Sequence, residues 1–165
     1  MTDTEAEVYA FLDKAGIEYE CARHERVSSI AECALPERLL NALMPRNLFL
    51  CPHNKTGYYL LIAHPESVFR TSSVSKQAGA SRLSFADDEA LRKLLHTFPG
   101  AVSPLGLMYE SAKDVHLLID RRLFDEEYLL FHPLDNTASV KLKTEDLIQK
   151  FLPACRQEYR IVELE

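Results

Sequence analysis

Apolar residues recur every three or four positions in several stretches of the chain, and this spacing predicts amphipathic helices. The clearest stretch runs from Glu5 to Ala15, with Thr4 as its N-cap and Gly16 as the residue that ends it. Shorter helices are expected in five places: one capped by Ser28 or Ser29, one with Pro36 in its first turn and Leu39, Leu40 and Leu43 on one face, Val74 to Ala78 ended by Gly79, one capped by Asp87 and reaching about His96, and Glu145 to Leu152 capped by Thr144.

Other stretches alternate between apolar and polar residues or are continuously apolar over the length of a strand. The Asn54-Lys55-Thr56-Gly57 turn separates two of them and predicts a hairpin. The expected strands are Ile17 to Ala22, Asn47 to Cys51, Tyr58 to Ala63, Val115 to Asp120, Tyr128 to Phe131, Ala138 to Leu142 and Tyr159 to Leu164. Because strands and helices mix without strict alternation, we expect a single α+β domain over residues 1–165, built around a mixed sheet.

Composition agrees with one soluble domain. A chain of 165 residues with 47% hydrophobic and 27% charged residues can bury a core without disulfides or metals. Its apolar runs are far shorter than the ~20 residues that span a bilayer. The acidic N-terminus is unlike a signal peptide, so we expect a cytoplasmic protein without membrane contact. The net charge of −6 argues against non-specific nucleic-acid binding but leaves room for a local basic rim.

Cysteine and histidine spacing gives no metal signal. The four cysteines (Cys21, Cys33, Cys51 and Cys155) contain no CxxC pair, and buried free thiols are the simpler interpretation. No two histidines have helical ligand spacing, and we expect His53 and His64, which flank the hairpin, to be exposed. HExxH, GxxxxGK and GxSxG motifs are absent, so we expect no metal and no cofactor.

Two irregular segments contain residues suited to a binding pocket. In the first, from Pro99 to Gly106, two glycines and two prolines fix a backbone path that can present N–H and C=O groups to a ligand. In the second, His132 to Thr137, polar side chains follow directly after an apolar strand. On spacing alone, an ordinary tight connection and a turn with a hydrogen-bonded histidine remain the simpler alternatives.

Five basic residues could contact phosphate: Arg46, Lys76, Arg82, Arg92 and Lys93. Arg92 and Lys93 are typical of a solvated helix surface. Arg46 stands out because it immediately precedes a buried-looking strand. The residues by themselves therefore support a soluble α+β domain with a polar pocket.

Several segments, taken together and in order, resemble the YbaK/prolyl-tRNA synthetase-associated domain family. Within that family the resemblance is to free-standing alanyl-tRNA(Pro) deacylases. The segments are Asn47-Leu48-Phe49-Leu50, Ser75-Lys76-Gln77-Ala78-Gly79, Arg82-Leu83-Ser84-Phe85-Ala86, Pro99 to Leu107, Leu118-Ile119-Asp120, and Phe131-His132-Pro133 with Asn136-Thr137. They span most of the chain. The resemblance implies a barrel-like mixed sheet with flanking helices and a pocket for the aminoacyl group at the tRNA 3′ end.

The resemblance also implies an activity, the hydrolysis of mischarged aminoacyl-tRNA, with alanyl-tRNA(Pro) as the expected substrate. Gly100 to Pro104 matches the family's GxxxP loop. Arg46 stands where the family usually has a lysine that matters for activity, and arginine differs from lysine in bulk and donor geometry. The expected catalytic residues are Arg46, Gly100, Ala101, Val102, Ser103 and Pro104. The expected substrate-binding residues are Asn47, Leu48, Leu50, Lys76, Phe85, His132 and Asn136.

An activated ester needs no protein nucleophile, so positioning a water and stabilising the oxyanion can suffice. We expect the Gly100 to Pro104 backbone to do this, assisted by the ribose hydroxyl of the substrate, while Arg46 holds the terminal phosphate or the ester oxygen. A pocket that admits alanine and excludes proline would supply the selectivity, since a missing methylene is worth only about 1–3 kcal/mol.

Two alternatives stay open at this point. The first is a different substrate, a mischarged tRNA that carries cysteine or serine. The second, suggested by Arg46 in place of lysine, is a tRNA-binding module with weakened chemistry. The expected partners are the tRNA 3′ end and prolyl-tRNA synthetase. A role in binding a partner without tRNA is the least favoured interpretation.

Overall fold

A computed structural model describes residues 1–25 and 34–165 of the chain. Its strands form two sheets, a five-stranded mixed sheet in the order β4-β2-β3-β5-β8 and a three-stranded antiparallel sheet in the order β1-β7-β6. The strands are β1 (Glu20–Arg23), β2 (Arg46–Pro52), β3 (Tyr59–Ala63), β4 (Leu83–Phe85), β5 (His116–Asp120), β6 (Tyr128–Phe131), β7 (Ala138–Lys143) and β8 (Tyr159–Val162). The predicted α+β class is confirmed, with the strands divided between two sheets.

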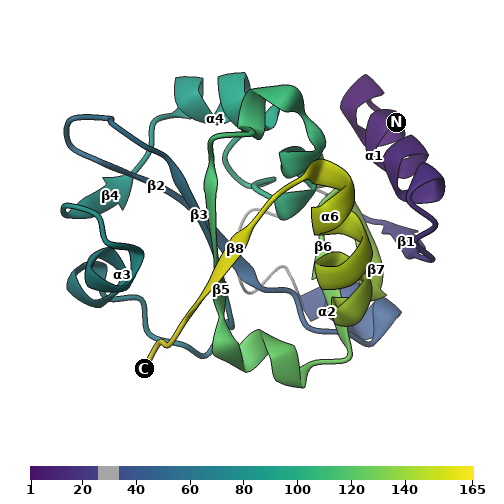
Figure 1. The fold of residues 1–165 in the computed structure, drawn as a ribbon. Coiled ribbons are helices and arrows are strands. Elements are labelled where there is room, and N and C mark those ends of the chain that lie inside the picture. The colour runs from purple at the N-terminus through teal and green to yellow at the C-terminus, as the bar shows by residue number, and fades with distance from the viewer. Residues whose placement is uncertain (26–33) are drawn as a thin grey trace.

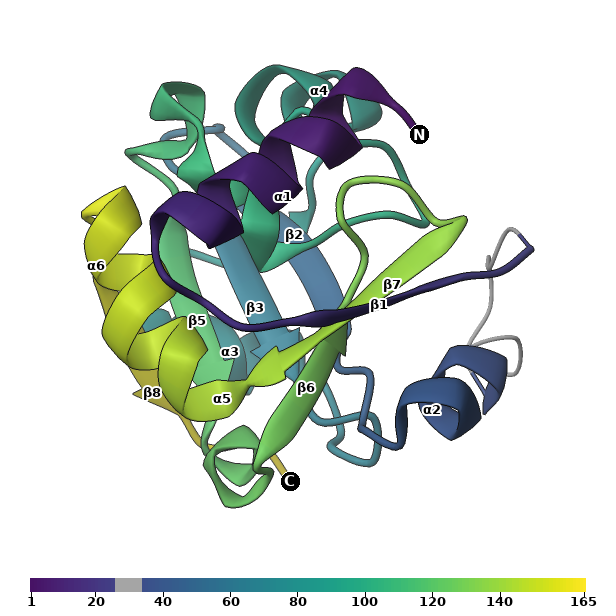
Figure 2. The same cartoon turned by 90° about the vertical axis from the view of Figure 1, so that its right-hand side faces the viewer.

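The helices pack on both faces of the larger sheet. They are α1 (Asp3–Lys14), α2 (Ala34–Leu40), α3 (Thr71–Ala78), α4 (Asp88–Leu95), α5 (Thr144–Asp146) and α6 (Leu152–Cys155), with a π-helical turn η4 (Leu147–Phe151) between the last two and 3-10 helices η1 (Pro104–Met108), η2 (Glu110–Ala112) and η3 (Arg121–Asp125). Figure 1 shows α3 on one side of the five-stranded sheet and α6 with the smaller sheet on the other. Figure 2 shows α1 crossing over the top of the molecule.

The larger sheet therefore separates two hydrophobic clusters. The cluster on the α3 side includes Leu50, Leu61 and Val74, and the larger cluster on the opposite side includes Phe49 and Ile62. Successive side chains of a strand point to opposite faces. Along β2, Arg46 and Leu48 consequently share the face of Leu50, whereas Asn47 shares the face of Phe49. This alternation determines which predicted site residues can meet.

Most predicted helix ends are confirmed. Asp87 caps α4 by accepting a hydrogen bond from the Ala90 N–H at 2.8 Å, and Gly79 ends α3 with a φ of 69°. The first predicted cap was wrong. Thr2, not Thr4, caps α1 by accepting from the Glu5 N–H at 3.1 Å. The expected caps Ser28 and Ser29 lie outside the described residues.

The Thr144 prediction was wrong for a tertiary reason. Thr144 lies inside the helix, and its hydroxyl donates to the Glu126 carbonyl at 2.6 Å instead of capping. The predicted apolar face of the second helix also fails in part, because the Leu39 side chain is 57% exposed.

The β2–β3 hairpin has the predicted position, with Arg46 opposite Ala63 and Leu50 opposite Tyr59. The first strand begins at Glu20, later than predicted, because Ile17 is buried and its N–H donates to the Leu12 carbonyl. His53 is exposed as expected, but His64 is buried, and the Asp120 carboxylate accepts its backbone N–H at 2.9 Å.

Candidate functional site

The side chain of Asn47 carries a buried hydrogen-bond acceptor that has no donor among the described residues. Its side-chain Nδ2 donates to the Pro45 carbonyl at 3.4 Å, which orients the amide. Its Oδ1 is buried and, within the described residues, has no hydrogen-bond partner. An unsatisfied buried acceptor costs about 1–3 kcal/mol. Such a group is retained at a cost in stability, and a ligand with a donor would remove that cost.

Arg46 lies beside Asn47 in the chain but on the opposite face of β2. The strand register places Arg46 opposite Ala63, a member of the α3-side cluster, and Asn47 opposite Ile62, a member of the larger cluster. Arg46 is half-buried, and no carboxylate of the described chain pairs with it. The two residues can therefore serve one ligand only by contacting different parts of it.

The bend that begins at Gly100 is held by hydrogen bonds on both sides. Gly100 has a φ of 95°, a conformation that favours glycine. The next residue, Ala101, is fully buried, its N–H donates to the Phe98 carbonyl at 3.0 Å, and its carbonyl accepts from the Thr97 hydroxyl at 2.8 Å. The backbone path is thus fixed before any ligand arrives.

Ser103 uses its hydroxyl to start the following helix. The Ser103 Oγ accepts from the Leu105 N–H at 3.1 Å, and Pro104 occupies the first position of η1. In the described part of the chain, the backbone N–H groups of Val102 and Ser103 have no acceptor. Two N–H groups in a fixed bend are suited to bind an oxygen that gains negative charge.

His132 follows β6 and is almost completely buried. Its Nδ1 lies 2.9 Å from the Ala138 carbonyl, so Nδ1 must carry the hydrogen and Nε2 has the lone pair. Burial, with a smaller contribution from His24, lowers the pKa of His132. The ring is therefore neutral at pH 7, and Nε2 can accept a hydrogen bond.

His24 is a neighbour of this histidine that sequence reasoning missed. The two rings lie 6.2 Å apart between centroids, and His24 Nε2 lies 2.8 Å from the Ser139 Oγ. The pairing of β1 with β7 brings them together, and no local pattern in the sequence indicates it. Asn136, which was predicted, is buried in the same connection between β6 and β7.

Three of the predicted segments converge on the larger cluster. Phe49 next to Asn47, Leu105 next to Pro104, and Phe131 next to His132 all belong to it. In addition, Leu43 and Leu129 form an isolated parallel β-bridge, so the two segments run in the same direction from this point. Arg46 follows three residues after Leu43, and His132 follows three residues after Leu129. The structure thus gathers Asn47, the Gly100 to Pro104 bend and the His132 to Asn136 connection around one core.

The other predicted residues lie on the α3 face. Leu50 is fully buried in the α3-side cluster, and Leu48 packs against that cluster. Phe85 in β4 is 65% exposed. Lys76 is exposed and, with Arg82, borders a hollow of about 630 Å³ over α3. None of these four predicted residues shares the face of Asn47.

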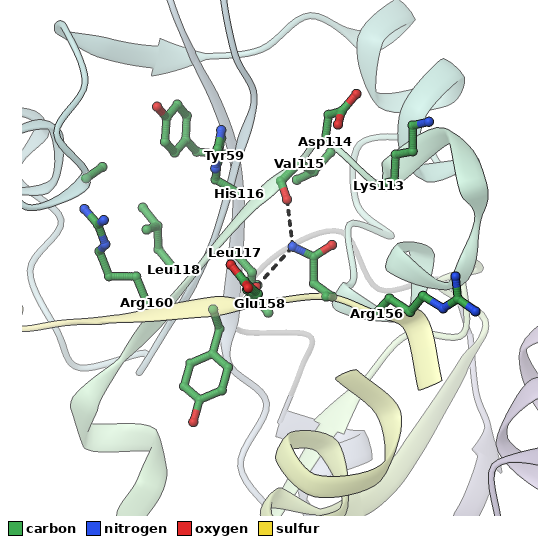
Figure 3. A pocket seen from close by; sticks show the side chains of 13 residues that line it. Tyr59, Lys113, Asp114, Val115, His116, Leu117, Leu118, Arg156, Glu158 and Arg160 are labelled. Carbon is green, nitrogen blue, oxygen red and sulfur yellow. Dashed lines mark hydrogen bonds between the residues drawn. The ribbon is translucent and has the colours of Figure 1, made fainter. Parts of the chain in front are cut away.

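A separate groove of about 540 Å³ lies where β5 and β8 begin (Figure 3). Tyr59 and His116 stack there at 4.8 Å between centroids, Arg160 lies across from them, and Gln157 donates to the Val115 carbonyl at 2.8 Å. No predicted site residue lines this groove. Both basic and acidic side chains line the groove, so its charge favours neither an anionic nor a cationic ligand.

Among residues 1–25 and 34–165, no three histidine, cysteine or acidic side chains are grouped as metal ligands would be. Over the same residues, every helix is too short or too polar to cross a bilayer. Cys21, Cys51 and Cys155 are free; Cys21 is exposed, Cys51 is buried, and Cys33 lies outside the described residues.

Comparison with known proteins gives a consistent result. Residues 24–150 match the model of the aminoacyl-tRNA editing domain family. The chain is 30% identical to the prolyl-tRNA editing protein ProX of Acetoanaerobium sticklandii over 98% of both chains. It is 26% identical to prolyl-tRNA synthetase associated domain-containing protein 1 of Danio rerio, over 89% of this chain and 80% of that protein. Among solved structures, a candidate trans-editing enzyme for prolyl-tRNA synthetase superimposes with a TM-score of 0.75 at 14% identity, covering 100% of this chain and 98% of that one.

Proposed function

The chain belongs to the aminoacyl-tRNA editing domain family, and we propose that it hydrolyses mischarged tRNA in trans, with alanyl-tRNA(Pro) as its substrate. The likeness to a prolyl-tRNA editing protein over 98% of both chains supports the reaction class. The buried Oδ1 of Asn47, which has no hydrogen-bond partner among the described residues, is the observation that carries the proposal. Asn47 is on the face of β2 that packs on the larger cluster, and Val102 and Leu105 of the bend segment pack on the same cluster.

The proposed chemistry uses groups that are already fixed. The N–H groups of Val102 and Ser103 bind the carbonyl oxygen of the ester as it becomes an oxyanion, and an aligned water attacks the carbonyl carbon. The bond to the ribose oxygen then breaks, and the neighbouring ribose hydroxyl assists the proton transfer to it. No protein nucleophile is needed, and the Ser103 hydroxyl, which caps η1, is not one.

Asn47 and His132 present acceptors to the substrate. An aminoacyl ester has an α-ammonium group with three N–H donors, and Asn47 Oδ1 lacks a donor within the described chain. Neutral His132 offers Nε2 as a second acceptor. An ester without its α-amino group would lose these contacts, so it is expected to be hydrolysed more slowly.

Size gives the proposed selectivity. A pocket beside the bend that accommodates a methyl side chain excludes the proline ring, whereas a synthetase pocket built for proline cannot strongly reject alanine. Cysteine and serine are little larger than alanine, so esters of these amino acids are the relevant competitors. Their relative rates of hydrolysis define the substrate.

Arg46 has a binding role in this proposal. It supplies a permanent positive charge to the terminal phosphate from the other face of β2. We place the reaction in the cytoplasm, with the tRNA 3′ end as the partner and prolyl-tRNA synthetase as the source of the mischarged tRNA.

Single-turnover hydrolysis tests the function. Alanyl-tRNA(Pro) should decay well above background, and prolyl-tRNA(Pro) should not; cysteinyl- and seryl-tRNA serve as competitors. Asn47→Ala should slow hydrolysis, while Asn41→Gly, which removes an exposed amide at a φ of 51° that glycine adopts easily, should leave it unchanged. Equal, background-level decay of all substrates would refute the proposal. A large gain in rate in Arg46→Lys with unchanged tRNA binding would favour a weakened binding module.

A further inference from the structure

Phe85 is an exposed aromatic residue that packing does not explain. It lies in β4, the edge strand of the five-stranded sheet, with 65% of its surface exposed. Its ring lies 6.1 Å from that of Phe69 between centroids at an angle of 55°. Figure 1 places β4 and α3 together at the edge of the molecule far from α1 and α6. An exposed aromatic ring offers a face on which a nucleic-acid base can stack.

Two unpaired cations lie near this ring pair. Lys76 and Arg82 border the hollow over α3, and neither forms an ion pair within the described chain. Arg70, by contrast, is bound to Glu165 at 2.9 Å. Lys76 and Arg82 could therefore contact phosphates without first breaking an ion pair to a carboxylate of the described chain.

Phe85 and Arg46 lie on the same face of the five-stranded sheet. Phe85 pairs with Leu50, and Arg46 lies four residues before Leu50 on the same face of β2. At 3.3 Å per residue this separation is about 13 Å. Leu48 lies between them and packs on the same cluster as Phe69. A chain of phosphates that passes Arg46 can therefore reach Phe85 within a few nucleotides.

We propose that this α3 face binds the unpaired 3′ strand of the tRNA, with one base stacked on Phe85 and phosphates against Lys76 and Arg82. The proposal rests on the proposed function and adds where the nucleic acid lies. Proteins bind single strands with exposed aromatic rings for the bases and with cations for the backbone. The α3 face offers both within one surface, and Arg46 connects it to the strand that carries Asn47.

Binding of uncharged tRNA(Pro), measured by fluorescence anisotropy over a range of salt concentrations, tests the proposal without requiring hydrolysis. Phe85→Ala should weaken binding by about fivefold or more, the loss expected for one stacked base, and Phe85→Tyr should retain it. The double variant Lys76→Gln/Arg82→Gln should lower the slope of log affinity against log salt by about 1.4, or about 0.7 for each lost phosphate contact.

Matched controls distinguish this surface from general effects. Phe124→Ala removes another exposed phenylalanine, and Arg92→Gln/Lys93→Gln removes two exposed cations without ion pairs from α4. Both should bind tRNA as the wild type does. The proposal is wrong if Phe85→Ala binds normally, if the controls weaken binding equally, or if Phe85→Ala affects only binding to prolyl-tRNA synthetase. A wild type that binds tRNA through Phe85 but does not hydrolyse alanyl-tRNA(Pro) would refute the proposed function alone.

Discussion

Removing the guanidinium of Arg23 should destabilise the protein far more than removing an arginine whose carboxylate partner is exposed. The side chain of Glu5 is completely buried, and Arg23 binds it through two hydrogen bonds of 2.6 and 3.3 Å. The Tyr9 hydroxyl donates to the same carboxylate at 3.0 Å. Burial and the acidic neighbours raise the pKa of Tyr9, so this hydroxyl remains a donor. Arg23→Ala would leave a buried carboxylate with one neutral partner.

The size of the effect follows from this geometry. Removing one partner of a buried ion pair costs about 3–5 kcal/mol. Since the Arg23 side chain is 51% exposed, water can enter when it is truncated, so the lower end, about 3 kcal/mol, is expected. For a chain of this length that loss lowers Tm by roughly 6–12 °C.

Urea unfolding and thermal melting measure this loss, and Arg70→Ala is the control. Arg70 pairs with Glu165, and both side chains are mostly exposed, so this change should cost no more than about 1 kcal/mol. The double variant Glu5→Gln/Arg23→Met should be more stable than Arg23→Ala, because no buried charge is left. Equal, small losses in Arg23→Ala and Arg70→Ala would show that the pair contributes little.

Three further predictions follow from buried groups. Gly106→Ala should lower the free energy of unfolding by about 1–3 kcal/mol, because the new Cβ would lie 2.7 Å from the Leu95 carbonyl oxygen. Gly57→Ala is the control, since its Cβ would meet no atom closer than 3.7 Å and the change should be neutral in urea unfolding. Equal losses in the two variants would contradict this prediction. The pKa of His132 is lowered in the folded state, so the unfolded state binds the proton first and the free energy of unfolding should fall as pH drops below about 6.5. In urea titrations, His132→Asn should reduce this pH dependence by up to about 1.4 kcal/mol per pH unit. An unchanged dependence would refute the lowered pKa of His132. Partial burial raises the pKa of Cys155 to about 12. In a variant that lacks the other thiols, Cys155 should therefore react with a disulfide reagent at pH 8 much more slowly in the native than in the unfolded protein, and equal labelling rates in the two states would contradict this.

Elements whose signals are local were predicted well from the sequence. The β2–β3 hairpin has two apolar runs and its own turn, and α4 has its cap and its apolar face within ten residues. Elements that depend on distant partners were not. β4 has three residues and exists because it pairs with β2, and the Thr144 hydroxyl binds a carbonyl 18 residues away. The division into two sheets depends on the same kind of long-range pairing.

The sequence predicted which segments contribute to the candidate site but not how those segments are arranged in space. The order of the motifs indicated Asn47, the Gly100 to Pro104 bend and His132, and these segments converge on one core. The assignment of Leu50 and Phe85 to the substrate pocket depended on the direction of their side chains. Strand alternation predicts that Leu50 and Asn47 point to opposite faces of β2, but not which of the two faces packs towards the bend. Tertiary packing determines that face, and it places Leu50 in the α3-side cluster.

In the proposed function, the two faces of β2 have different roles. Asn47 shares its face with the bend that would stabilise the oxyanion, while Arg46 shares its face with Phe85 and the basic hollow. On this arrangement the residue at position 46 contributes charge to the tRNA and not a proton to the ester. Arginine can make that contribution as well as lysine, because it carries the same charge at every physiological pH. Arg46→Lys should then alter tRNA affinity more than the maximal rate of hydrolysis, and Asn47→Ala should do the reverse.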